Sequence, residues 1–270
     1  MAVDAGPYKF GYALKGNIDK PVVLFLHGFL GNKDDWRGIS NSLNSDFATL
    51  AVDLPGHGET TVADVSLYRM ENCAAGLVEF IDQLGIRKCH CAGYSMGGRL
   101  ALYLAVNFPE RFASIVIESA SPGLKTPEER AARIEHDAEL IDRLETGDFH
   151  QFLTDWYSQP IFASLSEHEE RFAQLFRQRM DNHPPGLALS LRMMGTGVQP
   201  SLWHRLDEIE VPILSMVGEL DLKYVGIANE MSLLCRRMER RIISDSGHNT
   251  HFEKPREYTE FVRKFLMKNT

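Results

Sequence analysis

The run from Gly93 to Arg99, Gly-Tyr-Ser-Met-Gly-Gly-Arg, has the spacing of a nucleophile elbow, where a strand turns sharply into a helix with a serine at the apex. Glycines on both sides of the serine permit the close backbone packing that this turn requires. Ser95 is therefore the first candidate for chemistry. Arg99 lies four residues later, in the first turn of the expected helix, where the helix dipole disfavours a cation. An arginine in that position indicates an anionic ligand.

A serine hydroxyl becomes a useful nucleophile or base when a histidine accepts its proton and a carboxylate orients that histidine. After such an elbow, the acid and then the histidine are expected further along the chain. Asp221, in the loop after the apolar run 213–217, is the preferred acid because the loop needs a few residues to carry the acid beyond the sheet edge, and Glu219 in the same loop is the alternative. His248 is the preferred base because it directly follows a glycine, and His251 is the alternative.

Two backbone amides are expected to stabilise negative charge that develops on the substrate. One is the amide of Phe29, in the loop that follows the apolar run 22–26, and the other is the amide of Met96, directly after the serine. His27 in the first loop and His57 in the glycine-rich turn 53–58 are interpreted as structural histidines. The sequence shows no pattern of metal ligands, so neither a metal nor another cofactor is expected.

The elements that must position these residues alternate along the chain. Apolar runs typical of strands are separated by helical patterns, which predicts a mostly parallel, doubly wound α/β sheet. The predicted strands are 9–14, 22–26, 49–54, 89–94, 114–118, 213–217 and 240–243.

The stretch 122–199 interrupts this alternation, because it contains helix signals and no convincing strand. We expect a helical cap inserted between core segments 1–121 and 200–270. Thr126 and Glu129, with Pro127 between them, form a capping box that predicts a helix ending at Gly147. Ser166 and Glu169 predict the start of a second helix in the same way.

The predicted cap carries seven arginines and one lysine. A guanidinium group binds carboxylates in a bidentate manner that an ammonium group cannot reproduce, so several of these arginines are expected at the site. Solvated helix faces are the alternative, and Arg133 with Asp137 has the spacing of an ordinary i, i+4 ion pair.

Composition limits the classes of partner. The chain has 270 residues and a formal net charge of −8, and it lacks the basic runs that bind nucleic acid. We find neither a secretory signal nor an apolar run long enough for membrane insertion. The four cysteines have no metal-binding spacing, so reduced thiols and a cytoplasmic location are expected. No particular oligomeric state is predicted.

These motifs together resemble the α/β-hydrolase superfamily over nearly the whole chain. They are the loop 27–29, the turn 53–58, the elbow at Ser95, Asp221 and His248. A narrower resemblance extends into the predicted cap and covers the elbow 93–99 with 118–124, 128–133, 155–157, 160–162, 195–197 and 247–251. These segments are similar to the 2-succinyl-6-hydroxy-2,4-cyclohexadiene-1-carboxylate (SHCHC) synthases of menaquinone biosynthesis.

The narrower resemblance implies a lyase that removes a ring proton from 2-succinyl-5-enolpyruvyl-6-hydroxy-3-cyclohexene-1-carboxylate and releases pyruvate. This small-molecule substrate has three carboxylates, which fits a site rich in arginine. The family's binding arginines would correspond to Arg99, Arg133 and Arg179, with Arg177 as the alternative to the last. Tyr94, Trp156 and Tyr157 would supply walls or hydroxyl contacts.

Two other functions agree with the same residues. One is a serine hydrolase, such as a thioesterase, carboxylesterase or carbon–carbon bond hydrolase, in which Ser95 attacks a carbonyl and water completes the reaction. The other is a small-molecule receptor that retains the triad without turnover. Arg99 favours the lyase, because a neutral ester would give no reason for a cation at that position.

Overall fold

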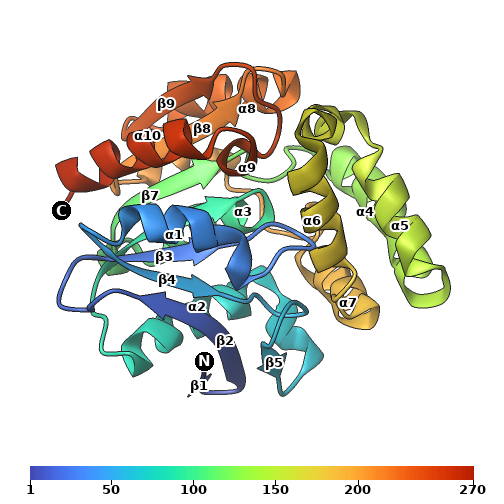
Figure 1. The fold of residues 1–270 in the computed structure, drawn as a ribbon, viewed down its shortest axis with the longest axis horizontal. Helices are drawn as coiled ribbons and strands as arrows, with labels where there is room; N and C mark the ends of the chain where they lie inside the picture. Colours follow the sequence, from blue (N-terminus) through green and yellow to red (C-terminus); the bar gives the residue numbers. More distant parts are fainter.

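A computed structural model describes all 270 residues, and a sheet with strand order β1-β2-β4-β3-β6-β7-β8-β9 forms its centre, with β5 paired to β2 (Figure 1). The strands are β1 (Ala2–Ala5), β2 (Tyr8–Lys15), β3 (Val22–Leu26), β4 (Ala48–Val52), β5 (Thr61–Val62), β6 (Cys89–Tyr94), β7 (Phe112–Glu118), β8 (Ile213–Gly218) and β9 (Met238–Ile243). The pairs from β4 through β9 are parallel, whereas β2 is antiparallel to each of its neighbours. The carboxyl ends of the parallel strands therefore meet at one edge, where ligands bind in sheets of this kind.

Helices cover both faces of the parallel strands, which explains why β3, β4 and β8 are buried along their whole length. The core helices are α1 (Arg37–Leu43), α2 (Met70–Gln83), α3 (Met96–Asn107), α8 (Leu222–Leu234), α9 (Thr250–Glu253) and α10 (Pro255–Lys268). Buried side chains of α2 and α3 pack in the larger apolar core, and those of α1 and α10 pack in a separate core on the opposite face. Short 3₁₀ helices are η1 (Lys33–Trp36), η2 (Val65–Tyr68), η3 (Pro109–Arg111) and η5 (Trp203–Glu208).

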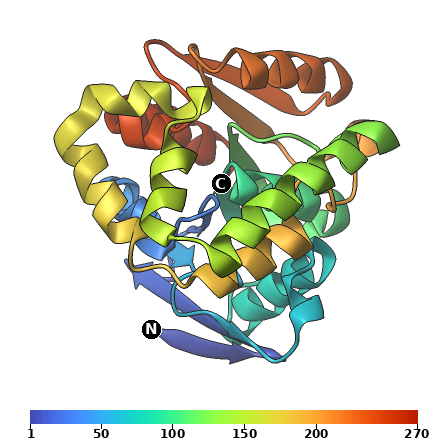
Figure 2. The ribbon, with the colours of Figure 1, turned by 90° about the vertical axis from the view of Figure 1, so that its right-hand side faces the viewer.

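Four helices and a 3₁₀ segment lie over the carboxyl edge of the sheet, between β7 and β8 in the chain. They are α4 (Pro127–Thr146), α5 (Phe149–Tyr157), η4 (Pro160–His168), α6 (Glu169–Arg179) and α7 (Pro184–Met194), and we call them the cap helices. Figure 2 looks onto this side of the molecule, with the cap helices in front of the sheet. They share a small apolar core that includes Phe152 and Leu187, and Leu30 from the loop after β3 joins it.

The predicted strands at 22–26 and 89–94 have these bounds in the structure, and the other five differ by one or two residues at an end. The short edge strands β1 and β5 were not predicted, because neither contains an apolar run. The capping box of Thr126 and Glu129 is present at the start of α4. None of the helices combines the length and the apolarity needed to cross a bilayer.

The second predicted capping box is wrong. Residues 160–168 form η4, and α6 begins at Glu169 after His168, without a side-chain cap. The Ser166 hydroxyl donates to the carbonyl of Ala163 at 2.7 Å. It is therefore occupied by a local bond within η4 and does not cap the next helix.

Candidate active site

The turn between β6 and α3 places Ser95 at the apex of a strained elbow. Ser95 has φ 49° and ψ −106°, in a region that residues with side chains rarely adopt. A Cβ atom at Gly93 would collide with the carbonyl of Gly97, and one at Gly97 would collide with the carbonyl of Leu26 in β3. The two glycines are thus required by close backbone approach, and this approach brings the serine to the carboxyl edge of the sheet.

Ser95, His248 and Asp221 form a continuous chain of hydrogen bonds. His248 Nδ1 donates to Asp221 Oδ2 at 2.7 Å, and the Ser95 hydroxyl lies 3.2 Å from His248 Nε2. His248 and Asp221 are 3% and 6% exposed, so little water competes for these bonds. This arrangement allows the histidine to accept a proton from the serine while the aspartate orients the ring.

The alternatives for the acid and the base lie elsewhere. His251 Nδ1 bonds to Glu118 Oε2 at 2.7 Å, and its ring stacks on Trp36 with 4.4 Å between the ring centroids. Glu219 is exposed and accepts from the amide of Asp245 at 3.2 Å. Neither side chain bonds to the serine or to His248.

His27 and His57 are buried under the loop that leads from β3 to η1. His27 Nε2 accepts from the amide of Leu54 at 2.9 Å, and His57 Nε2 accepts from the amide of Leu30 at 3.3 Å. Burial lowers the pKa of both rings, which fits neutral rings that accept a hydrogen bond. Each histidine therefore links its own loop to the other one by a hydrogen bond.

The amides of Phe29 and Met96 are available beside the serine. Neither donates a hydrogen bond within the protein, although most buried amides do. A Cβ atom at Gly28 would lie 3.6 Å from Ser95 Cβ, so the loop that carries Phe29 runs directly past the serine. The two amides can serve a developing oxyanion as a pair.

A cavity of about 370 Å³ opens between the triad and the cap helices. Ser95 and His248 line its core side, and the cap contributes Arg133 and Trp156. Arg99 lines it from α3. A ligand in this cavity would therefore contact the serine and two arginines together.

Arg99 is a buried cation with no carboxylate partner. Its guanidinium group donates to the carbonyl of Met194 at 2.9 Å and to the side-chain oxygen of Gln199, and the residue is 8% exposed. Burial lowers the pKa of Arg99 to about 10, so the group stays charged at neutral pH. A buried charge that meets only neutral acceptors is costly unless an anion joins it.

Arg133 reaches the same cavity from α4, and its Nε donates to Asp137 at 2.7 Å. The predicted i, i+4 pair is therefore present, and it holds the guanidinium group at the cavity wall. Burial raises the pKa of Asp137, although Arg133 opposes this shift.

Arg179 is buried, whereas Arg177 is exposed on the same helix. Arg179 lines a smaller hollow next to Ser95, outside the large cavity. Its guanidinium group pairs with Asp35 at 2.7 Å. Burial lowers the pKa of Arg179, but the Asp35 carboxylate more than offsets this effect and raises it above the usual value.

The aromatic residues surround the triad. Trp156 lines the large cavity, whereas Tyr94 lies under the histidine, with 5.4 Å between its ring centroid and that of His248. Tyr224 was not predicted, and its ring centroid lies 4.8 Å from that of His248. Tyr224 and the neighbouring Lys223 line the cavity, and their place directly after Asp221 at the start of α8 was the available signal.

Comparison with known protein families identifies the class of protein to which this chain belongs. A family model described as the alpha/beta hydrolase fold matches residues 21–255. The chain therefore belongs to the α/β hydrolases, as the elbow, the sheet order and the helical insertion also indicate.

Relatives within that class narrow the assignment. A Bacillus subtilis protein named as a candidate SHCHC synthase is 38% identical, over 96% of this chain and 94% of its own. The SHCHC synthase of Serratia proteamaculans is 32% identical, over 94% and 96%. The structure of MenH from S. aureus matches with a TM-score of 0.91 and 33% identity, covering 98% of this chain and 99% of that one. The chain belongs to the SHCHC synthase family.

Proposed function

We propose that this protein is a lyase that converts 2-succinyl-5-enolpyruvyl-6-hydroxy-3-cyclohexene-1-carboxylate to SHCHC and pyruvate, in menaquinone or phylloquinone biosynthesis. The observation that carries this proposal is Arg99, a buried guanidinium group without a carboxylate partner in the cavity that contains Ser95. A neutral ester would leave that charge uncompensated, whereas a tricarboxylate supplies its counter-ion. The names of the relatives support the same reaction.

In the proposed mechanism, Ser95 acts as the base. Asp221 orients His248, which takes the hydroxyl proton, and the serine oxygen then removes the proton from the ring carbon that bears the succinyl group. The ring electrons shift to form the conjugated diene, and the carbon–oxygen bond to the enolpyruvyl group breaks. The released enolate takes up the proton that His248 holds and becomes pyruvate, while Ser95 keeps the ring proton, so the triad returns to its starting state. No water is consumed and no acyl-enzyme forms.

Negative charge develops on the succinyl carbonyl when the ring proton leaves, because the carbonyl is conjugated with that carbon. The free amides of Phe29 and Met96 are the donors for this oxygen. Fixed donors that need no rearrangement contribute most when charge is largest, so they stabilise the transition state more than the bound substrate.

In this proposal, different arginines bind different carboxylates of the substrate. Arg99 and Arg133 line the large cavity and are assigned one region of the substrate, and Arg179 is assigned another on the far side of Ser95. Trp156 supplies a wall of the cavity and Tyr94 supports the histidine. Binding several charges at fixed points orients the ring carbon toward the serine, which lowers the entropic part of the barrier.

The test follows pyruvate release from the enolpyruvyl substrate, measured by coupled oxidation of NADH with lactate dehydrogenase. Wild type is expected to release one pyruvate per SHCHC formed, over many turnovers. Ser95→Ala is expected to lower kcat by at least about a thousandfold, since the base is gone, with substrate affinity nearly unchanged. Ser42→Ala, an exposed serine in α1, is the control. Near-normal turnover by Ser95→Ala would exclude the serine as base.

Hydrolysis of a nitrophenyl ester by the same preparations separates the lyase from a serine hydrolase. A hydrolase would cleave the ester and release little or no pyruvate, and a receptor would show neither reaction. The proposal requires pyruvate release to dominate.

A further inference from the structure

A buried ion pair joins the cap helices to the core beside Ser95. Arg179, at the end of α6, donates through Nη1 to Asp35 Oδ1 at 2.8 Å and through Nη2 to Asp35 Oδ2 at 2.7 Å. Arg179 Nε lies 3.3 Å from the hydroxyl of Tyr157 in α5. The two charged side chains are 5% and 10% exposed. The pairing is bidentate, so it fixes the orientation of the guanidinium plane as well as its position.

The ion pair lies between two hollows. On one side is a hollow of about 30 Å³ that is lined by Ser95, Asn249 and both members of the ion pair, Asp35 and Arg179. On the other side is an open hollow of about 390 Å³, bounded by residues of α1 and α6, which Arg179 and Asp35 also line. The inner hollow exceeds the roughly 10–15 Å³ that a cavity needs to hold one water molecule, so it can admit a small polar group.

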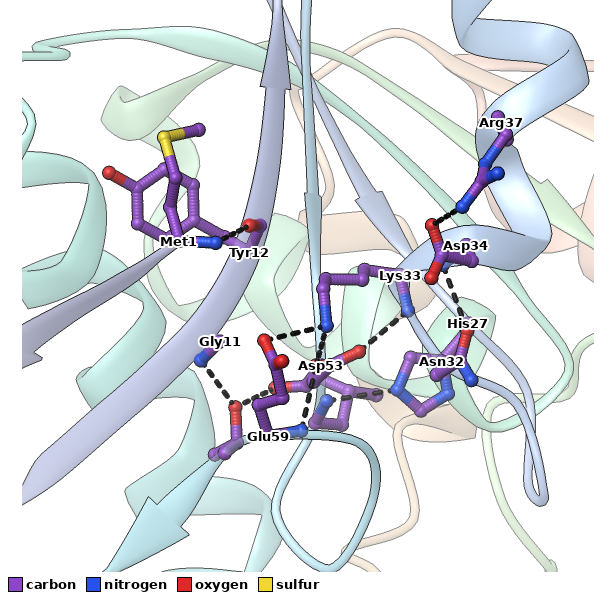
Figure 3. A network of polar contacts seen from close by, with 12 residues as sticks. Met1, Gly11, Tyr12, His27, Asn32, Lys33, Asp34, Arg37, Asp53 and Glu59 are labelled. Atoms are coloured by element: carbon purple, nitrogen blue, oxygen red, sulfur yellow. Dashed lines mark hydrogen bonds and ion pairs between the residues drawn. The ribbon is translucent and has the colours of Figure 1, made fainter. Parts of the chain in front are cut away.

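Asp35 stands on a segment that the core holds in place. Asp53, fully buried, accepts from the amide of Lys33 at 2.7 Å and from its ammonium group at 2.8 Å. Asn32 accepts from the amide of Asp34 at 2.9 Å, which orders the turn directly before Asp35. Figure 3 shows these bonds at Asn32, Lys33 and Asp34, where the loop after β3 leads into η1. The backbone that carries Asp35 is therefore held by the core, and its carboxylate can fix the position of Arg179 from the cap.

We propose that Asp35 is a positioning residue, which holds the Arg179 guanidinium group beside the inner hollow so that one of its remaining N–H groups donates to a substrate carboxylate. Two N–H groups of Arg179 are left after the bonds to Asp35 and Tyr157, because a guanidinium group has five donors. Asp35 also compensates the buried charge of Arg179 when no substrate is present. The inference rests on the proposed function. It adds Asp35 to the residues that support substrate binding, and Asp35 does so through Arg179.

A double-mutant cycle of Asp35→Asn and Arg179→Gln tests this role. Asp35→Asn is expected to raise KM for the enolpyruvyl substrate about tenfold, and Arg179→Gln by at least as much, since each weakens a charge-assisted bond. The double variant should have no higher a KM than Arg179→Gln alone, because the Asp35 carboxylate, which also lines the inner hollow, repels a substrate carboxylate and can favour its binding only through Arg179. The pH profile of kcat should stay that of wild type, since the triad is untouched.

Two results would overturn the proposal. One is a wild-type KM for Asp35→Asn, which would make the ion pair a structural tie only. The other is a further tenfold rise in KM when Asp35→Asn is added to Arg179→Gln, which would mean that Asp35 acts independently. Glu145→Gln is the matched control, because it breaks the exposed pair of Arg192 and Glu145 in the cap.

Asp35→Asn leaves a buried cation unpaired and can prevent folding, so Asp35→Glu is the second variant. It keeps the charge and moves the carboxylate outward by one methylene group. We expect wild-type resistance to urea with KM raised severalfold, and an unchanged KM would overturn the proposal.

Failure of the proposed function can be told apart from failure of the role proposed for Asp35. If wild type releases no pyruvate, the lyase assignment is wrong, and calorimetric titration with pyruvate then tests Asp35 without turnover. We expect Asp35→Glu to weaken pyruvate binding severalfold. Equal binding by the variant and wild type, or no binding by wild type, would contradict the role of Asp35.

Discussion

Arg99 shows how a single residue separates two functions that share a triad. Its guanidinium group is buried in α3 against neutral oxygens of Met194 and Gln199, and burial lowers its pKa to about 10. A protein that acted only on neutral esters would gain nothing from this costly arrangement. Arg99 is therefore the residue on which the proposed preference for an anionic substrate rests most directly.

Arg99→Ala should lower kcat/KM for the enolpyruvyl substrate by about tenfold to a hundredfold, because a charge-assisted hydrogen bond to a carboxylate is lost. Hydrolysis of a neutral nitrophenyl ester should be unaffected. Arg192→Ala, which removes an arginine with a 44% exposed side chain from α7, is the control. An equal loss with both substrates would show that Arg99 supports the fold of the elbow instead.

At the scale of elements, the loop after β3 and the turn after β4 depend on each other. Asp53 accepts from Lys33 and from the amide of Glu59 at 2.9 Å, and the adjacent Leu54 donates to His27. Figure 3 shows that these bonds connect the two segments. The Phe29 amide belongs to the first segment, so its place beside the serine depends on a carboxylate at the end of another strand.

Asp53→Asn should lower the free energy of unfolding by about 3 kcal/mol, because it removes the fully buried charge of the pair with Lys33 and weakens the bonds from the amides of Lys33 and Glu59. Glu59→Gln removes the other carboxylate from Lys33, but Glu59 has a 66% exposed side chain, and its loss should cost less than about 1 kcal/mol. Urea denaturation of both variants measures the difference. Equal effects would mean that the burial of Asp53 does not decide the strength of the pair.

The whole molecule should lose stability in mild acid, because several buried histidines are neutral when it is folded. Burial lowers the pKa of His90 to about 4, and the nearby Lys88 adds to this shift. Burial also lowers the pKa of His27 and His57. In the unfolded chain these rings take up protons near pH 6.5. The unfolded state thus binds more protons between pH 6.5 and 4, so stability falls as pH falls through that window.

His90 alone should account for about 3 kcal/mol of the loss in unfolding free energy between pH 7.5 and 4. His90→Gln should therefore show a smaller loss over this range by about that amount, measured by urea denaturation at each pH. His204→Gln, which removes an exposed histidine, is the control and should follow wild type. An identical pH dependence in His90→Gln would show that the ring is protonated in the folded protein.

The sequence by itself determined the α/β class and the alternation of strands and helices along the chain, because apolar runs and glycine spacing are local properties. It also indicated Ser95, Asp221 and His248 as candidates, since a nucleophile elbow requires partners after later strands. The bounds of Val22–Leu26 followed directly from a continuous apolar run, and those of Cys89–Tyr94 from the residues that lead into the elbow.

Only the tertiary structure decided which charges meet across the molecule. The sequence could not show that Arg179 pairs with Asp35, 144 positions away, or that Tyr224 packs against His248. The sequence favoured Asp221 over Glu219 only by loop length, and the bond from His248 to Asp221 Oδ2 is a contact that only the folded chain shows. Such contacts depend on how the cap helices lie over the sheet edge, and no local pattern in the chain encodes that arrangement.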